Sequence, residues 1–190
     1  MIEIKIVERE LLKKYRQDLS KINQGGVRMV KALDGVRVID LTHAYNGPFC
    51  TMHLADHGAE VIKIEKPGVG DMTREWPPIK NGESGYFGNI NRNKKSVTLD
   101  IRKEEGKLIF LDLVKTADVV VDNFRPGTLD RLGLGYEVLK EINPKIILAE
   151  SSGFGQYGPL KDRAAYDVIA QAMAGICSIT GFQDGPPIKV

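Results

Sequence analysis

The stretch VRVIDLTHAYNGPFCTMHLADHGAEVIKIE occupies residues 36–65 and decides the fold. It begins with an apolar, β-branched run at residues 36–41, which is typical of a buried strand. Helical apolar spacing follows over residues 49–57, and Gly58 predicts the end of that helix. A second strand is predicted over residues 60–65. The stretch therefore predicts a strand, a helix and a parallel second strand in a right-handed βαβ connection.

The same alternation continues toward the C-terminus. Strands are predicted over residues 96–101, 118–122 and 145–150, and helices over 104–116, 128–132 and 136–142. Residues 70–92 show no clear period, and long irregular stretches in compact domains are usually functional or mobile. A helix rich in small residues is predicted over residues 166–180, and we expect it to be deeply buried or to lie at an interface. The predicted fold class is α/β, a Rossmann-like, mostly parallel sheet with flanking helices.

The first residues form a different kind of sequence. Residues 1–31 hold eight Lys and Arg against four Asp and Glu, a charge of +4, whereas the whole chain carries +2. We interpret residues 1–31 as a basic helical extension, solvated or serving as a dimer appendage, and residues 32–190 as part of one domain. Because the remainder is close to neutral, a nucleic-acid partner is not predicted.

The composition also limits the location of the chain and its metal chemistry. No apolar run approaches the length of a membrane helix, so no membrane partner is predicted. Two cysteines in 190 residues favour a reducing compartment, and we expect a cytoplasmic location. His53 and His57 have metal-ligand spacing on a helix, but no third ligand accompanies them, so we predict no metal.

In a parallel sheet, ligands bind beyond the carboxyl ends of the strands. This rule selects residues 42–48, 66–71, 123–127 and 151–157. Basic side chains at or near strand ends and connections suit an anionic, phosphorylated ligand: Lys66, Arg74, Lys94, Lys95, Arg102, Arg125, Arg131 and Arg163. No glycine pair completes the dinucleotide fingerprint, so the residues alone predict an anionic, nucleotide-like ligand and no particular cofactor.

Several motifs occur together in a fixed order. They include LDGVRVIDLT (residues 33–42), LADHGAEVIKIE (54–65), GD (70–71), NRNKKS (91–96), ADVVVDNFRPG (117–127), GFG (153–155) and YD (166–167). In these motifs the chain resembles the class III CoA-transferase family, whose members include formyl-CoA and carnitine CoA-transferases. The resemblance runs from about Leu33 to the last residue.

The resemblance implies a large Rossmann-like domain, an interlocked homodimer and coenzyme A or acyl-CoA as substrate, with CoA along the sheet edge selected above. The CoA-binding positions that it implies are Tyr45, Asn46, Lys66, Leu99, Asp100, Ile101, Arg102, Asn123, Phe124, Arg125, Arg131, Arg163, Tyr166 and Asp167. Tyr86 matches an aromatic residue near the reacting acyl group, and Tyr166, Asp167 and Tyr86 are the auxiliary candidates for catalysis.

The chemistry that the resemblance implies is CoA transfer between an acyl-CoA thioester and a carboxylic acid, through an aspartyl anhydride and an aspartyl-CoA thioester. The family's nucleophilic Asp lies beyond Val190, and neither Asp167 nor Asp184 takes its place. We therefore interpret the chain as an N-terminal portion without the C-terminal half, and we expect it to be inactive alone. Two alternatives stay open: the 2-methylacyl-CoA racemase branch of the fold, and a non-catalytic CoA-binding half that needs a partner chain.

Overall fold

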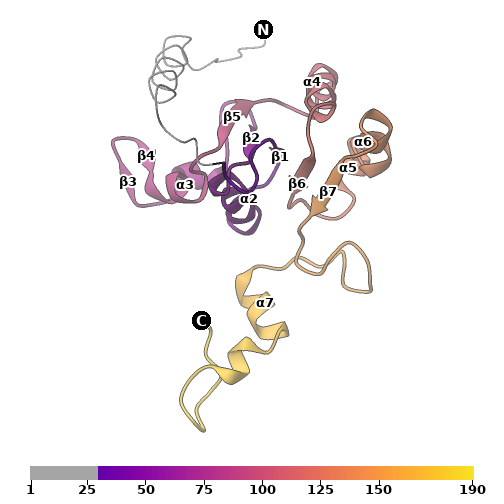
Figure 1. Cartoon of the computed structure of the whole chain (residues 1–190). Helices are drawn as coiled ribbons and strands as arrows, with labels where there is room; N and C mark the ends of the chain where they lie inside the picture. The colour runs from indigo at the N-terminus through magenta and orange to yellow at the C-terminus, as the bar shows by residue number, and fades with distance from the viewer. Residues whose placement is uncertain (1–29) are drawn as a thin grey trace.

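A five-stranded parallel sheet forms the centre of the molecule (Figure 1). The computed structural model describes residues 30–190, so the predicted extension over residues 1–31 lies almost wholly outside the described residues. The strand order is β5-β2-β1-β6-β7. The strands are β1 (Arg37–Asp40), β2 (Glu60–Glu65), β5 (Lys95–Thr98), β6 (Val119–Asp122) and β7 (Ile147–Glu150). Counted along the chain within this sheet, the order is 3-2-1-4-5, as in the first five strands of the Rossmann fold, and it confirms the predicted fold class.

Helices make the connections between the parallel strands. α2 (Asn46–Asp56) joins β1 to β2, α4 (Glu104–Val114) joins β5 to β6, and α5 (Thr128–Arg131) and α6 (Tyr136–Ile142) join β6 to β7. The β2–β5 connection holds η1 (Met72–Glu75), β3 (Ile79–Lys80), β4 (Glu83–Ser84) and α3 (Gly85–Ile90). After β7 come α7 (Asp167–Met173) and the 3₁₀ helix η2 (Ile176–Ile179). Within residues 30–190, none of these helices has the length and apolar character that a membrane span requires.

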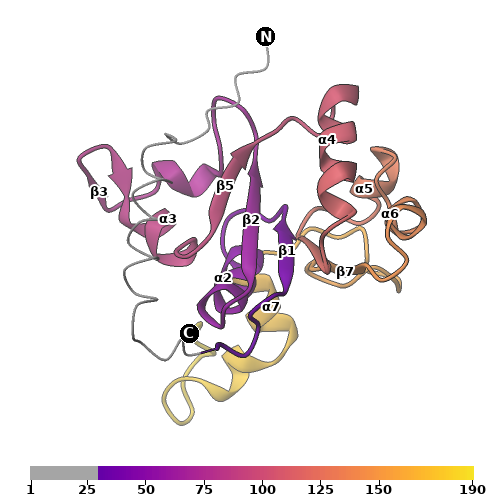
Figure 2. The same ribbon diagram turned by 45° about the horizontal axis from the view of Figure 1, so that its top comes forward.

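The sheet has an apolar core on each face, because successive strand residues point to opposite sides. On one face, Ile39 and Val120 pack in a buried cluster with Phe110 of α4 and Leu139 of α6. On the other face, a smaller cluster joins the sheet to α2 and contains Val38, Ala55, Ala59, Val61 and Val121. Figure 2 shows α4, α5 and α6 grouped beside β6 and β7, with α2 beside β1 and β2.

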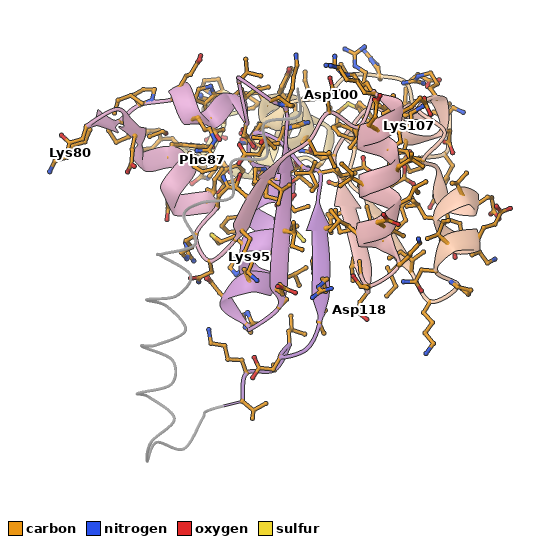
Figure 3. The ribbon with its side chains drawn as sticks, turned by 90° about the horizontal axis from the view of Figure 1, so that it is seen from above. Lys80, Phe87, Lys95, Asp100, Lys107 and Asp118 are labelled. Atoms are coloured by element: carbon orange, nitrogen blue, oxygen red, sulfur yellow. The ribbon has the colours of Figure 1, made fainter. Side chains whose placement is uncertain are left out.

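All carboxyl ends of the parallel strands lie at one edge of the sheet. β1 pairs with β2 on one side and with β6 on the other, so the strand order reverses between β1 and β6. In Figure 3, Asp100 lies at this edge, whereas Lys95 and Asp118 lie toward the amino ends of their strands. The loops after β1 and β6 therefore flank the switch point, where doubly wound sheets bind ligands.

Several predicted elements differ from the observed ones. The first helix begins at Asn46 rather than at residue 49, because Pro48 fits the first helical turn without losing a hydrogen bond. Residues 70–92, predicted to be irregular, contain η1, a short hairpin and α3. The strand predicted over residues 145–150 is not buried: Ile147 is 59% exposed, because β7 is an edge strand.

The helix predicted over residues 166–180 is also different. Gly175 adopts a left-handed conformation (φ 82°) and separates α7 from η2. Deep burial is wrong for this segment, since Val168, Ile169 and Met173 are exposed and Gln171 is the buried residue of α7. Figure 1 shows α7 and the C-terminus away from the sheet.

Candidate functional site

A cavity of about 500 Å³ opens at the carboxyl edge of the sheet. Its lining comes from the ends of β1, β2, β5 and β6 and from the loops and helices that follow them: Leu41, His43, Ile64, Glu65, Lys66, Val69, Gly70, Met72, Glu75, Leu99, Asp100, Ile101, Arg102, Phe124, Thr128 and Leu132. Four strands thus supply one cavity, as the carboxyl-edge rule predicts. Its volume lies within the ordinary range for small-molecule and cofactor sites.

Several of the predicted CoA-binding residues meet in this cavity. Those that line it are Lys66, Leu99, Asp100, Ile101, Arg102 and Phe124. Lys66 is exposed, and among the described residues no ion pair engages its ammonium group. The cavity therefore combines apolar walls with at least two cations, Lys66 and Arg102, which suits a ligand that is part aromatic or aliphatic and part anionic.

The loops at the switch point are fixed to each other by side-chain amides. Asn123 accepts a hydrogen bond from the backbone N–H of His43 (2.8 Å) and donates to the His43 carbonyl (2.8 Å). It also donates to Asn46 Oδ1, and Asn46 donates to Ser151 Oγ, each at 2.8 Å. Asn123 and Asn46 therefore hold the loops after β1, β6 and β7 together beside the cavity rather than inside it.

His43 presents its ring to the cavity. The ring lies 5.2 Å from that of Phe124, centroid to centroid. Burial lowers the pKa of His43 below its ordinary value, and the positive charge of Lys63 lowers it further. At neutral pH the imidazole is therefore an uncharged part of the cavity wall.

Four of the predicted anion-binding cations are engaged by carboxylates. Arg102 forms a two-contact pair with Asp100, with both distances 2.8 Å, and its hydrogen bonds lower the pKa of Asp100 to about 2. Arg74 pairs in the same way with Glu65 at 2.7 and 2.6 Å. The prediction is wrong for Lys94, which is 2% exposed and bonded to Asp40, and for Lys95, which begins β5 and pairs with Glu60.

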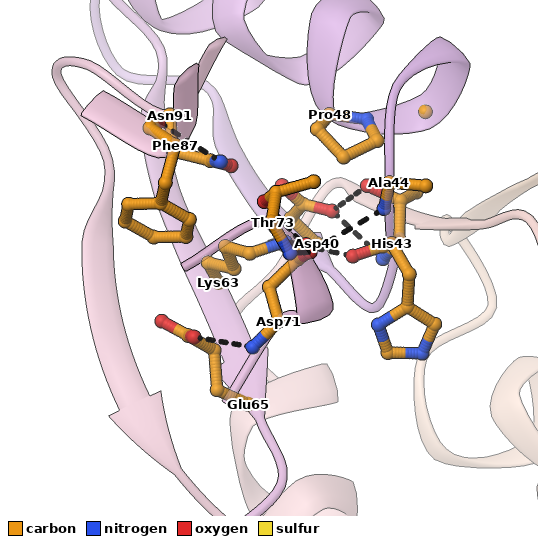
Figure 4. A network of polar contacts seen from close by, with 12 residues as sticks. Asp40, His43, Ala44, Pro48, Lys63, Glu65, Asp71, Thr73, Phe87 and Asn91 are labelled. Carbon is orange, nitrogen blue, oxygen red and sulfur yellow. Dashed lines mark hydrogen bonds and ion pairs between the residues drawn. The ribbon is translucent and has the colours of Figure 1, made fainter. Parts of the chain in front are cut away.

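A buried polar network lies beneath the cavity (Figure 4). Lys63 Nζ donates to the Thr42 carbonyl (2.7 Å) and pairs with Asp71 Oδ2 (3.0 Å). Burial acts to raise the pKa of Asp71, but the charge of Lys63 and the hydrogen bonds from Thr73 outweigh it and lower that pKa. Asp71 and Lys63 are therefore an ion pair in the folded protein. The hydrogen bonds to Asp71 Oδ1 and from Lys63 to the Thr42 carbonyl help to make the buried charges tolerable, while Asp71 Oδ2 is compensated by the Lys63 ammonium group.

Two glycines allow close approaches that shape the edge. A Cβ at Gly106, in the first turn of α4, would lie 2.0 Å from the carbonyl oxygen of Asp100. A Cβ at Gly47, in the first turn of α2, would lie 2.4 Å from the Cβ of Thr42. Both helix starts can therefore pack directly onto the loops that carry site residues.

An aromatic group outside the cavity lining joins α2, α3 and the residue after η1, and it adjoins lining residues in the sequence, because Tyr45 is two residues from His43 and Trp76 follows Glu75. Tyr45 stacks on Phe49 at 5.4 Å, and Tyr86 contacts the rings of Tyr45 (6.3 Å) and Trp76 (5.1 Å). Burial raises the pKa of Tyr86 above its ordinary value, so its hydroxyl is neutral at physiological pH. Two of the sequence-predicted residues, Tyr45 and Tyr86, thus belong to one apolar surface.

The remaining predicted residues do not line the cavity. Arg131 donates to Thr128 Oγ1 (2.9 Å), and Thr128 is a lining residue, while Arg125 is exposed in the loop after β6. Arg163, Tyr166 and Asp167 are exposed on the segment after β7, where Tyr166 is 87% exposed and Asp167 accepts a hydrogen bond from Gln171 (2.6 Å). Their assignment to CoA binding stays a prediction.

Sequence reasoning misses the buried network. The local pattern makes Lys63 one residue of an apolar strand, and Asp71 part of a glycine loop. The sequence does contain a signal of buried charge. Lys63 and Asp40 are each a charged residue between two apolar neighbours, and they stand opposite each other in the register of β2 on β1. A charged residue in a strand buried on both faces predicts a buried partner.

A doubly wound parallel sheet with a partly basic cavity at its carboxyl edge places the chain in the α/β class. The sequence model of CoA-transferase family III matches residues 33–190, and the chain belongs to that family. For residues 30–190, the structure contains no group of three or more His, Cys, Asp or Glu side chains placed to hold a metal ion.

Named relatives and solved structures agree with this family. The chain is 55% identical over 157 residues to the acetyl-CoA:oxalate CoA-transferase of Acetobacter aceti, covering 83% of this chain and 40% of that protein. It is 51% identical over 161 residues to the mouse (Mus musculus) succinyl-CoA:glutarate CoA-transferase, covering 84% and 37%. A CAIB/BAIF family protein from Brucella suis superposes with a TM-score of 0.80 at 44% identity, over 85% of this chain and 44% of that one. The chain therefore spans about two fifths of the length of these relatives.

Proposed function

We propose that this chain supplies the CoA-binding part of an acyl-CoA:carboxylate CoA-transferase. The observation that carries the proposal is the cavity, because Lys66, Arg102 and Phe124 line it at the positions that the family resemblance assigns to CoA. Strands that are separated in the sequence bring these three residues to one edge. Membership of CoA-transferase family III supports the same ligand.

CoA has three chemical parts, and the cavity offers a surface for each. The ammonium group of Lys66 is a compact point charge, and the guanidinium of Arg102 is a planar group with several N–H donors. Both suit the phosphate groups of CoA. Phe124, Ile64 and Leu99 provide apolar contact for the adenine ring and the aliphatic arm. The aromatic group around Tyr45 and Tyr86 extends from the cavity, and we assign it to the acyl end of the thioester.

The reaction that we propose proceeds through a carboxylate nucleophile. An Asp carboxylate attacks the acyl-CoA carbonyl and expels CoA thiolate, which leaves an aspartyl anhydride. The thiolate attacks the aspartyl carbonyl, releases the original acid and forms an aspartyl-CoA thioester. An acceptor carboxylate then attacks this thioester; the thiolate leaves and returns to the acceptor's mixed anhydride, so that the acceptor becomes the new acyl-CoA and the Asp is regenerated.

We assign none of the described carboxylates to this nucleophile. Asp167 is held by Gln171 on an exposed helix and is not among the residues that line the cavity.

The two transferases described above take oxalate or glutarate as acceptor, according to their names. We propose that the acceptor of this protein is likewise a dicarboxylic acid. We further propose that the whole protein acts as an interlocked homodimer in the cytoplasm, in keeping with the free thiols of Cys50 and Cys177.

Calorimetric titration with CoA tests the binding site. Lys66→Ala and Arg102→Ala should each weaken binding about 10- to 100-fold, because a hydrogen bond to a charged group contributes about 1.5–3 kcal/mol. Lys115→Ala is the matched control, since Lys115 pairs with Asp112 near the end of α4, outside the cavity. Wild-type affinity in both cavity variants would place CoA elsewhere.

Hydroxylamine trapping tests the assignment of the nucleophile. The chain is incubated with succinyl-CoA and oxalate, and acylated side chains are identified by mass spectrometry after hydroxylamine treatment. We expect no adduct and no exchange, because attack needs the reacting atoms about 3–3.5 Å apart and aligned. An adduct on Asp167 would show that this chain holds the nucleophile itself.

A further inference from the structure

Lys63 is a fully buried cation between two walls of the cavity. Its side chain is 1% exposed and that of its partner Asp71 is 0% exposed. The ammonium group reaches both the Thr42 carbonyl, at the end of β1, and the Asp71 carboxylate, after β2. Figure 4 shows Lys63 reaching from β2 toward Asp71 and the loop after β1.

The two groups that Lys63 binds are adjacent to cavity-lining residues. Thr42 lies between Leu41 and His43, and both of these line the cavity. Asp71 lies between Gly70 and Met72, which line the cavity from the segment after β2. One ammonium group therefore connects two walls of the cavity without touching its interior.

Asp71 strengthens this connection. Its Oδ1 accepts hydrogen bonds from the Thr73 backbone at 3.0 Å and hydroxyl at 2.8 Å, and from the Ala44 backbone at 3.4 Å. Glu65 accepts the backbone N–H of Asp71 at 3.0 Å. The loop after β2 is thus fixed both to the end of its own strand and to the loop after β1.

The second buried lysine gives the contrast that makes the inference specific. Lys94, with 2% of its side chain exposed, binds Asp40 Oδ2 (2.9 Å), the Pro48 carbonyl (2.9 Å) and Asn91 Oδ1 (2.8 Å). None of these three partners is among the residues that line the cavity. The two pairs share the same chemistry and similar burial, but they differ in what they join. Both groups bound by Lys63 adjoin lining residues, on two different loops, whereas of the Lys94 partners Asp40 adjoins the lining residue Leu41 and Pro48 and Asn91 adjoin none.

We propose that Lys63 is a positioning residue, whose ion pair with Asp71 and hydrogen bond to Thr42 set the separation of the two cavity walls for the ligand. The ligand is CoA, so this inference rests on the proposed function. A buried ion pair by itself adds little stability compared with apolar residues of similar volume. The role of the Lys63–Asp71 pair is therefore the geometry that it imposes on the two loops.

The test separates positioning from stability with paired variants. Lys63→Met leaves Asp71 buried without its cation and should destabilise the chain strongly, whereas the double variant K63M/D71N removes both charges and should regain most of the lost stability. The buried control is K94M/D40N, because the amide oxygen that replaces Asp40 Oδ1 still accepts from Thr42, and the Thr51 hydroxyl keeps the Gly47 and Pro48 carbonyls as acceptors. The exposed control is K115M/D112N.

Two quantities are measured on each variant: the thermal unfolding midpoint, and the dissociation constant for CoA by calorimetry. We expect K63M/D71N to bind CoA at least 10-fold more weakly than wild type despite its recovered midpoint. Both control pairs should keep a dissociation constant for CoA within about 3-fold of the wild-type value. That difference is smaller than a tenfold change, which corresponds to roughly 1.4 kcal/mol. Recovery of affinity together with stability in K63M/D71N would overturn the proposal.

Hydrogen exchange of the ligand-free chain keeps this inference distinct from the proposed function. Residues 41–44 and 70–73 should exchange faster in K63M/D71N than in wild type, with no such change in K115M/D112N. If wild type does not bind CoA, the proposed function fails while exchange still decides the positioning role, and unchanged exchange in both segments overturns that role. Should K63M/D71N not fold, Lys63→Arg replaces it in both measurements, because it keeps a cation beside Asp71 but changes the distance that the side chain imposes between the two loops.

Discussion

The sheet, residues 36–150, and the segment after it, residues 151–190, differ in what covers their apolar side chains. Phe110, Leu134 and Leu139 of the first region are 0% exposed, whereas Ile179 and Phe182 of the second are each 86% exposed. Both regions contain apolar residues at spacings that favour regular structure. The comparison teaches that periodicity identifies an apolar surface but does not say what that surface packs against.

The hydrogen bonds show the same difference. In the sheet region, bonds cross long stretches of sequence, such as Lys94 to Asp40 and Asn123 to His43. In the segment after the sheet, the side chain of Gln171 bonds to Asp167 and to the backbone of Val190, which belong to the same segment. Stability and the shape of the cavity therefore depend on the first region.

The largest effect is expected for Phe110→Ala. Phe110 is the fully buried anchor of α4 on the sheet, so its truncation should lower the free energy of unfolding by about 3–5 kcal/mol. Denaturant titration followed by circular dichroism measures this loss. A loss below about 1 kcal/mol would mean that α4 is not packed on the sheet as the structure shows.

An intermediate, pH-dependent effect is expected for Asp122→Asn at the end of β6. Burial raises the pKa of Asp122 from 3.8 to about 6, although a hydrogen bond from the Phe124 N–H opposes the shift. The folded state thus holds the proton more tightly than the unfolded state, and Asp122 costs stability as the pH rises between about 4 and 6. Asn keeps the acceptor for Phe124 without ionising.

At pH 7, Asp122→Asn should therefore be about 1–2 kcal/mol more stable than wild type, after allowance for solvent screening. The difference should vanish near pH 4. Thermal unfolding of both proteins from pH 4 to pH 8 measures it. A constant difference across this range would exclude titration of Asp122 as the cause.

The smallest effect is expected for Ile169→Ala in α7. Ile169 is 46% exposed, so truncation should change the free energy of unfolding by less than about 0.5 kcal/mol. The same denaturant titration as for Phe110→Ala gives the matched comparison. A loss of about 2 kcal/mol or more would show that α7 packs against another surface, and the contrast between the two regions would then disappear.

Much of the fold could be predicted from the sequence, because its signals are local. Strand β2 and helix α6 have the predicted bounds, since Gly58 and Pro67-Gly68 flank the strand, and Gly135 and Asn143-Pro144 flank the helix. The carboxyl-edge rule also selected loops that line the cavity, including those with Lys66 and Phe124. These predictions need only strand positions and a parallel sheet.

Partners distant in the sequence could not be predicted in the same way. Whether Lys94 faces a ligand or Asp40 depends on how β5 and α3 pack beside β1 and α2, which no local pattern encodes. The exposure of Tyr166 and the burial of Lys63 likewise depend on packing between elements that are distant in the sequence. Of the eight cations selected from the sequence, Lys66 and Arg102 line the cavity, because position after a strand does not determine which way a side chain points or what it contacts.

Hydrogen exchange with and without CoA tests the central claim most directly, namely that the ligand occupies the cavity of the sheet region. The account predicts slower exchange on CoA addition in residues 64–72, 99–102 and 123–128, with no change at the amino ends of the strands or in α7. Protection confined to residues 151–190, or none in the cavity loops at saturating CoA, would contradict it.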